Sequence, residues 1–86
     1  MASYKVLIKP SAVKELEAIP KKDRQRITIK IQTLADNPRP SGCQKLSGQE
    51  RYRLRQGNYR IVYEIQDKEL IVFVVKIGDR KDIYKD

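Results

Sequence analysis

The sequence contains no histidine and only one cysteine, Cys43. A single cysteine excludes an internal disulfide, and a zinc site is not expected where histidine is absent and only one thiol is present. No stretch approaches the ~20 apolar residues that a membrane-spanning helix needs, and the first residues lack the apolar run of a signal peptide. These absences predict a soluble, cytoplasmic protein that binds no metal ion and has no membrane partner.

The chain is also short, with 86 residues, which is the size of one domain. A chain of this length buries only about 60–65% of the surface that it exposes when unfolded. The core is therefore expected to be a thin layer between helices and a sheet, without room for a deep cofactor cavity. We predict a single domain over residues 1–86 and no cofactor.

Acidic residues are outnumbered, because 11 aspartates and glutamates stand against 19 lysines and arginines, for a net charge of +8. Such a field attracts polyanions, either nucleic acid or an acidic segment of another protein. A surplus of positive charge can also serve solubility alone. The composition by itself leaves these two explanations open.

The first half of the chain predicts a strand followed by two helices. Residues 4–9 (YKVLIK) form the strand, which ends at Pro10, and Ser11 is expected to cap the first helix through its side-chain oxygen. Pro20 ends that helix, since proline cannot continue the hydrogen-bond ladder. A second helix begins at Lys21. Its apolar residues recur at the spacing of a buried stripe: Ile27, Ile31, Leu34 and Ala35.

Three strands are predicted in the second half, at residues 50–55, 58–65 and 69–77, where β-branched and aromatic residues recur with a period of two. Tight connections at QGN (56–58) and QDK (66–68) separate them. The whole chain therefore predicts an α+β fold in which an N-terminal strand and a helical hairpin pack on an antiparallel meander. The tyrosines of the meander are expected at the core or its rim: Tyr52, Tyr59 and Tyr63.

Arginines alternate along the first strand of the meander, at positions 51, 53 and 55. Because successive side chains point to opposite faces of a sheet, these three share one face. The other face is predicted to lie under the helices and carries Leu54, Ile61, Ile65, Phe73 and Val75. The face left open carries Arg53, Arg55, Arg60 and Lys76. Glu64 is the one acidic residue expected near these cations on the open face.

This open cationic face has two explanations. Like charges placed near one another on a sheet cost stability, which favours a negative ligand lying against them. Arginine suits phosphate in particular, because its planar fork donates hydrogen bonds to two oxygens at once. A solvated face, or an edge that is charged to prevent aggregation, remains the alternative.

The order of strand, helix, helix and three-stranded meander, taken with three segments, resembles the RelE/ParE superfamily of bacterial toxins. The segments are LIKPSAVKELEAIP, KLSGQERYRLRQGNYRIVYEI and IVFVVKIGDRKDIY. The resemblance covers nearly the whole chain and implies the RelE-like fold, with a short helical tail after the last strand. It also implies a type II toxin–antitoxin system, in which a co-expressed antitoxin holds the toxin inactive.

The superfamily has two branches that act differently. RelE proteins are mRNA interferases that cut the messenger in the ribosomal A site, whereas ParE proteins poison DNA gyrase. The basic residues on the meander and the pair Arg80 and Tyr84 favour the RelE branch. The resemblance then implies a catalytic role for Arg55, Arg60, Arg80 and Tyr84. It implies substrate binding by Arg53, with Arg51 and Lys81 as further candidates.

The implied reaction is attack of a ribose 2′-hydroxyl on its own 3′-phosphate, which gives a 2′,3′-cyclic phosphate and a free 5′-hydroxyl. Arginines can position the phosphate and stabilise its extra negative charge. Arginine stays protonated, however, and is a poor base. Our hypothesis is that Tyr84 assists at the 2′ oxygen and Arg80 at the leaving oxygen.

The expected partners are a cognate RelB-like antitoxin with an acidic binding segment, the ribosome and mRNA. A toxin–antitoxin hetero-oligomer is expected from the same resemblance. Two other functions stay open at the level of the sequence. One is a ParE-like toxin that inhibits gyrase on the same fold, and the other is a nucleic-acid-binding module without catalytic activity.

Overall fold

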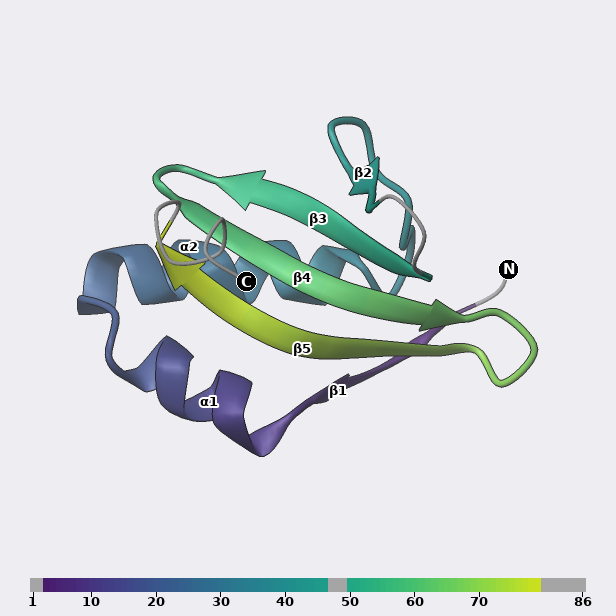
Figure 1. The fold of residues 1–86 in the computed structure, drawn as a ribbon, viewed down its shortest axis with the longest axis horizontal. Coiled ribbons are helices and arrows are strands. Elements are labelled where there is room, and N and C mark those ends of the chain that lie inside the picture. Colours follow the sequence, from purple (N-terminus) through teal and green to yellow (C-terminus); the bar gives the residue numbers. More distant parts are fainter. Residues whose placement is uncertain (1–2, 47–49, 80–86) are drawn as a thin grey trace.

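A computed structural model of the chain describes residues 3–46 and 50–79 (Figure 1). Along the sequence the elements are β1 (Lys5–Ile8), α1 (Pro10–Glu17), α2 (Lys21–Thr33), β2 (Gln44–Lys45), β3 (Arg51–Gln56), β4 (Tyr59–Gln66) and β5 (Ile71–Asp79). The predicted α+β class is confirmed, whereas the predicted C-terminal tail lies outside the described residues. Neither helix in this part of the chain is long and apolar enough to cross a bilayer.

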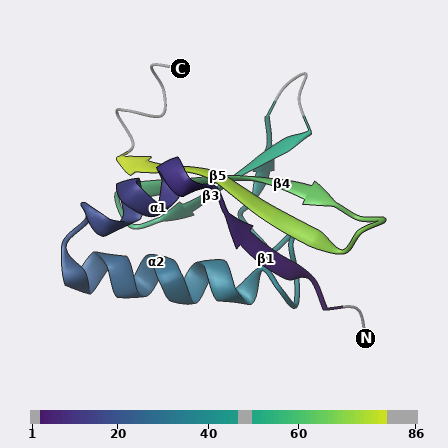
Figure 2. The same ribbon diagram turned by 90° about the horizontal axis from the view of Figure 1, so that it is seen from below.

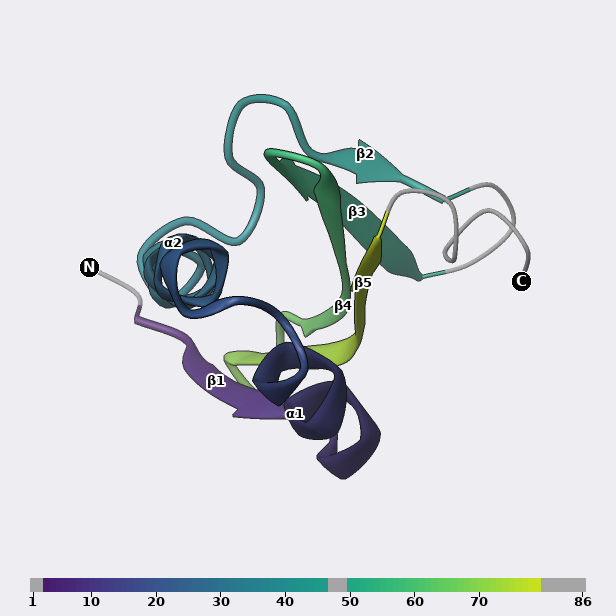
Figure 3. The same ribbon diagram turned by 90° about the vertical axis from the view of Figure 1, so that its left-hand side faces the viewer.

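The strands form one sheet in the order β1-β5-β4-β3-β2. β3, β4 and β5 are the predicted antiparallel meander. β1 extends it by pairing in parallel with β5, and β2 adds two residues beside β3 at the opposite edge. α1 and α2 lie on one face of this mixed sheet, which curves around them (Figures 2 and 3). The other face is therefore free of these two helices.

α1 begins at a proline rather than after a serine cap. Pro10 is the first helical residue, and Lys9 precedes it as the N-cap without a side-chain hydrogen bond to the helix. Proline fits this position, because its fixed φ suits a helix and the first N–H groups have no partner inside the helix. The prediction that Ser11 caps α1 is therefore wrong. Pro20 separates the two helices as predicted and is the N-cap of α2.

The core lies between the two helices and the sheet. The two helices and the residues just after them contribute Ala12, Ile19, Ile27, Ile31 and Leu34. The sheet contributes Leu54, Ile61, Tyr63, Val72, Val74 and Ile77. The predicted apolar stripe is confirmed for Ile27, Ile31 and Leu34, whereas Ala35 is not part of the core. Tyr52 and Tyr59 are partly buried against this core, as expected for rim aromatics.

A β-bulge changes which side chains of β5 enter the core. The pairing of β4 with β5 shifts between Val62 and Tyr63, which leaves Val75 as an extra residue on β5. An extra residue reverses the alternation of faces beyond it. Val74 is therefore fully buried, while Phe73 lies on the other face of the sheet. The prediction that Phe73 and Val75 belong to the core is wrong, because it assumed strict alternation along the strand.

Candidate nucleic-acid interface

A tight turn between β3 and β4 places two arginines directly across from each other. Gly57 has a positive φ of 59° and is the first residue of a two-residue hairpin turn, where the absence of a side chain makes this conformation favourable. The turn sets a register in which Arg55 on β3 lies opposite Arg60 on β4. Residues paired in this way have Cβ atoms about 4.5–5.5 Å apart. The two arginine side chains therefore leave neighbouring strands on the same face of the sheet.

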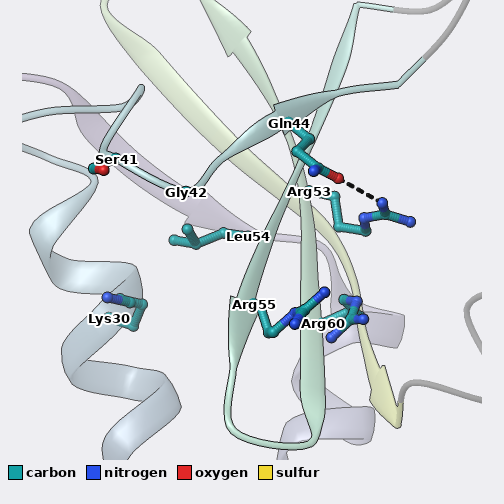
Figure 4. A pocket seen from close by; sticks show the side chains of 8 residues that line it. All are labelled: Lys30, Ser41, Gly42, Gln44, Arg53, Leu54, Arg55 and Arg60. Atoms are coloured by element: carbon teal, nitrogen blue, oxygen red, sulfur yellow. Dashed lines mark hydrogen bonds between the residues drawn. The ribbon is translucent and has the colours of Figure 1, made fainter.

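These two arginines line a pocket of about 310 Å³, which we call the arginine pocket (Figure 4). Its lining residues are Lys30, Ser41, Gly42, Gln44, Arg53, Leu54, Arg55 and Arg60. Among these described residues four carry a positive charge and none carries a carboxylate, so this part of the lining attracts anions. In the described part of the chain, no group of three or more acidic, cysteine or histidine side chains could hold a metal ion.

Arg53 is oriented by the short strand β2. Gln44 of β2 lies opposite Arg53 in the sheet, and its Oε1 accepts a hydrogen bond from a terminal nitrogen of Arg53 at 2.6 Å. A guanidinium held in this way loses less freedom when it binds a phosphate. Gln44 was not among the predicted site residues, because no pattern in the sequence indicates β2.

The arginines of the pocket differ in exposure. Arg55 is exposed and Arg53 is half-buried, whereas Arg60 is only 1% exposed. The prediction of an open cationic face is therefore wrong for Arg60, which sits on the central strand between Arg55 and Gly78. A cation held away from water interacts more strongly with an anion, because the local dielectric constant is lower. Arg60 is thus well suited to stabilise negative charge that develops at a bound phosphate.

Arg51 and Lys76 lie on the same face of the sheet but do not line the arginine pocket. The Nε of Arg51 donates to Glu64 on β4 at 3.0 Å. Both side chains remain partly exposed, so this ion pair is screened by water and contributes only about 0–1 kcal/mol. Glu64 reduces the charge that Arg51 can offer to a substrate, and substrate binding by Arg51 stays a prediction.

Three of the predicted site residues, Arg80, Lys81 and Tyr84, lie outside the described residues. Their roles stay predictions. The end of β5 nevertheless lies beside the arginine pair, because Gly78 is opposite Arg60.

The loop that carries residues 41–44 to the pocket is anchored at its start. The hydroxyl of Tyr63, a fully buried side chain, donates to the carbonyl oxygen of Pro38 at 2.7 Å. Burial raises the pKa of Tyr63, which keeps this hydroxyl neutral and able to donate. Arg39 donates two hydrogen bonds to the carboxylate of Asp67, at 2.9 and 3.2 Å. These contacts hold one wall of the arginine pocket against the sheet.

The anchor predicts a pH dependence of stability. Asp67 accepts hydrogen bonds from Arg39 and from Tyr4, and these lower its pKa, with Arg39 the larger cause. Because the carboxyl is more acidic in the folded state, its stabilisation is present above the unfolded pKa of about 3.9 and is lost as the pH falls through the folded pKa.

Asp67→Asn, which imitates the protonated side chain, is therefore expected to lower the melting temperature at neutral pH. The melting temperatures of the variant and of the wild type should converge once the pH is below the folded pKa of Asp67, where the wild-type carboxyl is protonated as well. Circular dichroism at both pH values measures the difference. An equal drop in melting temperature at both pH values would contradict a stabilising role for the Asp67 carboxylate.

Comparisons with known proteins show which family the chain is similar to. A family model described as ParE toxin of type II toxin-antitoxin system, parDE, matches residues 6–84. A RelE-like toxin protein of Escherichia coli is 34% identical over 94% of this chain and 90% of its own length. The mRNA interferase toxin RelE of Escherichia coli (strain K12) is 29% identical, over 87% of this chain and 83% of its own.

A solved structure agrees with these relatives. A chain in the crystal structure of the archaeal RelE–RelB complex from Pyrococcus horikoshii OT3 superposes with a TM-score of 0.82 at 30% identity. The match covers 91% of this chain and 96% of that chain. The protein therefore belongs to the RelE/ParE superfamily of toxins, and the RelE-like fold predicted from the sequence is confirmed.

Proposed function

We propose that this chain is the toxin of a type II toxin–antitoxin system and acts as an endoribonuclease that cleaves mRNA in the ribosomal A site. The observation that carries the proposal is the arginine pocket, where Arg55 lies opposite Arg60 and Lys30 and Arg53 add two further positive charges to the described lining. Relatives described as mRNA interferases support the same function.

The pocket suits the chemistry of RNA cleavage by a neighbouring hydroxyl. The 2′-hydroxyl attacks the 3′-phosphate in line with the 5′ oxygen, which leaves, and negative charge grows on the phosphate oxygens. In our proposal Arg55 binds the phosphate from the exposed side and Arg60 stabilises the growing charge. Arg53, held by Gln44, positions the strand. Binding and charge stabilisation are the main sources of catalysis in this proposal.

Proton transfer is assigned to residues near the C-terminus. Tyr84 assists transfer of the 2′-hydroxyl proton to water, and Arg80 stabilises the leaving 5′ oxygen until it takes a proton from water. Lys81 contacts the substrate backbone. The position of Gly78 opposite Arg60 supports this assignment, because Arg80 is only two residues after Gly78 in the sequence.

We also propose a RelB-like antitoxin as partner. Structural neighbours were crystallised as RelE–RelB complexes, including those from Pyrococcus horikoshii and Escherichia coli. The net charge of +8 favours an acidic binding segment in such a partner. An acidic segment lying over the arginine pocket would exclude RNA from it, which accounts for inhibition in a toxin–antitoxin hetero-oligomer.

The test of this function uses purified protein and ribosomes halted on a defined messenger. We expect cuts within the A-site codon, with a 2′,3′-cyclic phosphate on one product and a 5′-hydroxyl on the other. The same messenger without ribosomes should stay intact, and filling the A site with tRNA beforehand should prevent the cuts. Intact messenger on ribosomes with an empty A site would show that the proposal is wrong.

One observation favours a second function. The family model that matches residues 6–84 is that of the ParE toxin of the parDE system, and ParE proteins poison DNA gyrase. A supercoiling assay with purified gyrase separates the two functions. Our main proposal expects no effect on supercoiling, whereas inhibition at stoichiometric concentration together with intact messenger on ribosomes would establish the ParE-like activity.

A further inference from the structure

A lysine of the helical layer reaches the arginine pocket from the side opposite to the arginines. Lys30 belongs to the last turn of α2 and lines the same pocket as Arg53 and Arg55. Figure 4 shows Lys30 on the helix at one side, the arginines at the other, and Leu54 on the strand between them. None of the ion pairs between described residues involves Lys30. Lys30 is therefore a cation at the border of a space that is already cationic.

The pocket passes around an edge of the sheet. β2 pairs with β3 only at Tyr52 and Arg53, so no described strand covers β3 from Leu54 to Gln56 on that side. Main-chain N–H and C=O groups of alternate residues point outward from such an edge. They offer a ligand hydrogen bonds in addition to those of the cationic side chains. The uncovered edge thus connects the helix side of the pocket to the arginine side.

The rim of the pocket on the loop side is open. Gly42 has a φ of 95°, a left-handed conformation that favours glycine, and no atom lies within 4 Å of the place where its Cβ would be. Ser41 beside it offers a hydroxyl group. A side chain at position 42 would project from this rim, so glycine keeps the entrance clear for a strand that continues beyond the pocket.

The volume is larger than a single phosphate requires. At about 310 Å³ the pocket is at the lower end of the range of roughly 300–1,000 Å³ in which proteins bind small organic ligands. Single-stranded RNA carries one phosphate per nucleotide, so a strand crossing the pocket brings a second phosphate near the first. The arginine pair accounts for one phosphate, and the separate cation at Lys30 is left to account for another.

We propose that Lys30 binds the phosphate next to the scissile one, so that the arginine pocket holds two consecutive phosphates of single-stranded RNA. This inference rests on the proposed function, because the pocket must be the RNA site. Lys30 binds its phosphate as a point charge, while Arg55 and Arg60 bind the scissile phosphate. The length of RNA bound is then set by the distance across the pocket from α2 to β4.

The test compares two RNA ligands that cannot be cleaved, because their 2′ oxygens are methylated. A trinucleotide contains two phosphodiesters and a dinucleotide contains one. Lys30→Ala is expected to weaken binding of the trinucleotide by about tenfold, as for loss of one charged hydrogen bond, and binding of the dinucleotide by less than about twofold. Lys30→Arg should restore trinucleotide binding. Affinities are measured by NMR titration, which also reports whether the amides of Ser41 and Gly42 shift.

The matched control is Lys22→Ala, an exposed lysine two turns earlier on α2 that does not line the pocket. This variant also removes one positive charge, and it should lower the affinity for each ligand by less than about twofold. The inference is overturned if Lys30→Ala lowers the affinity for both ligands equally, or if it lowers neither affinity. Arg55→Ala separates this failure from failure of the proposed function. If Arg55→Ala also leaves both ligands bound at wild-type affinity, the pocket is not the RNA site.

Discussion

Arg55→Ala is expected to lower the rate of ribosome-dependent cleavage by on the order of 10²- to 10³-fold, as for loss of one donor to a developing negative charge. Arg55 is exposed and lies opposite Arg60, and like charges directly opposite each other destabilise a sheet. The stability of the fold is therefore expected not to fall. Single-turnover cleavage on halted ribosomes measures the rate, and urea denaturation measures the free energy of unfolding.

Two companion variants show whether geometry or charge is responsible. Arg60→Lys keeps the positive charge but loses the planar fork, so it should also reduce the cleavage rate. Lys68→Ala removes one charge from the exposed turn between β4 and β5 and should change the rate by less than about twofold. Cleavage by Arg55→Ala at the wild-type rate would remove the arginine pair from the mechanism.

Val74→Asp is expected to abolish folding. Val74 is completely buried in the core, and an unpaired charge buried there costs about 3–5 kcal/mol or more. At about 0.05–0.15 kcal/mol per residue, the whole net stability of a chain of this size is only ~4–13 kcal/mol. Loss of the cooperative thermal transition in circular dichroism is the expected result.

The neighbouring Val75→Asp is the matched control, because it makes the same chemical change one residue further along β5. Val75 is the extra residue of the bulge and is only partly buried, so a cooperative transition should remain, with a loss on the order of 1 kcal/mol. Strict alternation along β5 predicts the opposite order of the two effects. A folded Val74→Asp and an unfolded Val75→Asp would therefore contradict the bulge.

The comparison of these two valines shows where the sequence is an incomplete guide. Alternation correctly assigned Leu54 and Ile61 to the core, since β3 and β4 are regular where they carry these residues. It failed on β5, because a bulge depends on how two strands fit together and leaves no local mark in either. The same reason explains why β2 and Gln44 were missed. A two-residue strand exists only because β3 lies beside it.

The sequence by itself determined the class of fold, the meander and the alternation that gathers arginines on one face, because these follow from short-range periodicity and turn residues. The register that places Arg55 opposite Arg60, across the two-residue turn at Gly57, came from the structure. Only the tertiary structure decided that Arg60 is buried and that Arg51 is paired with Glu64. It alone brought Lys30 and Gln44 to the pocket. Burial and charge pairing depend on residues far apart in the chain, and these meet only when the sheet curves around the helices.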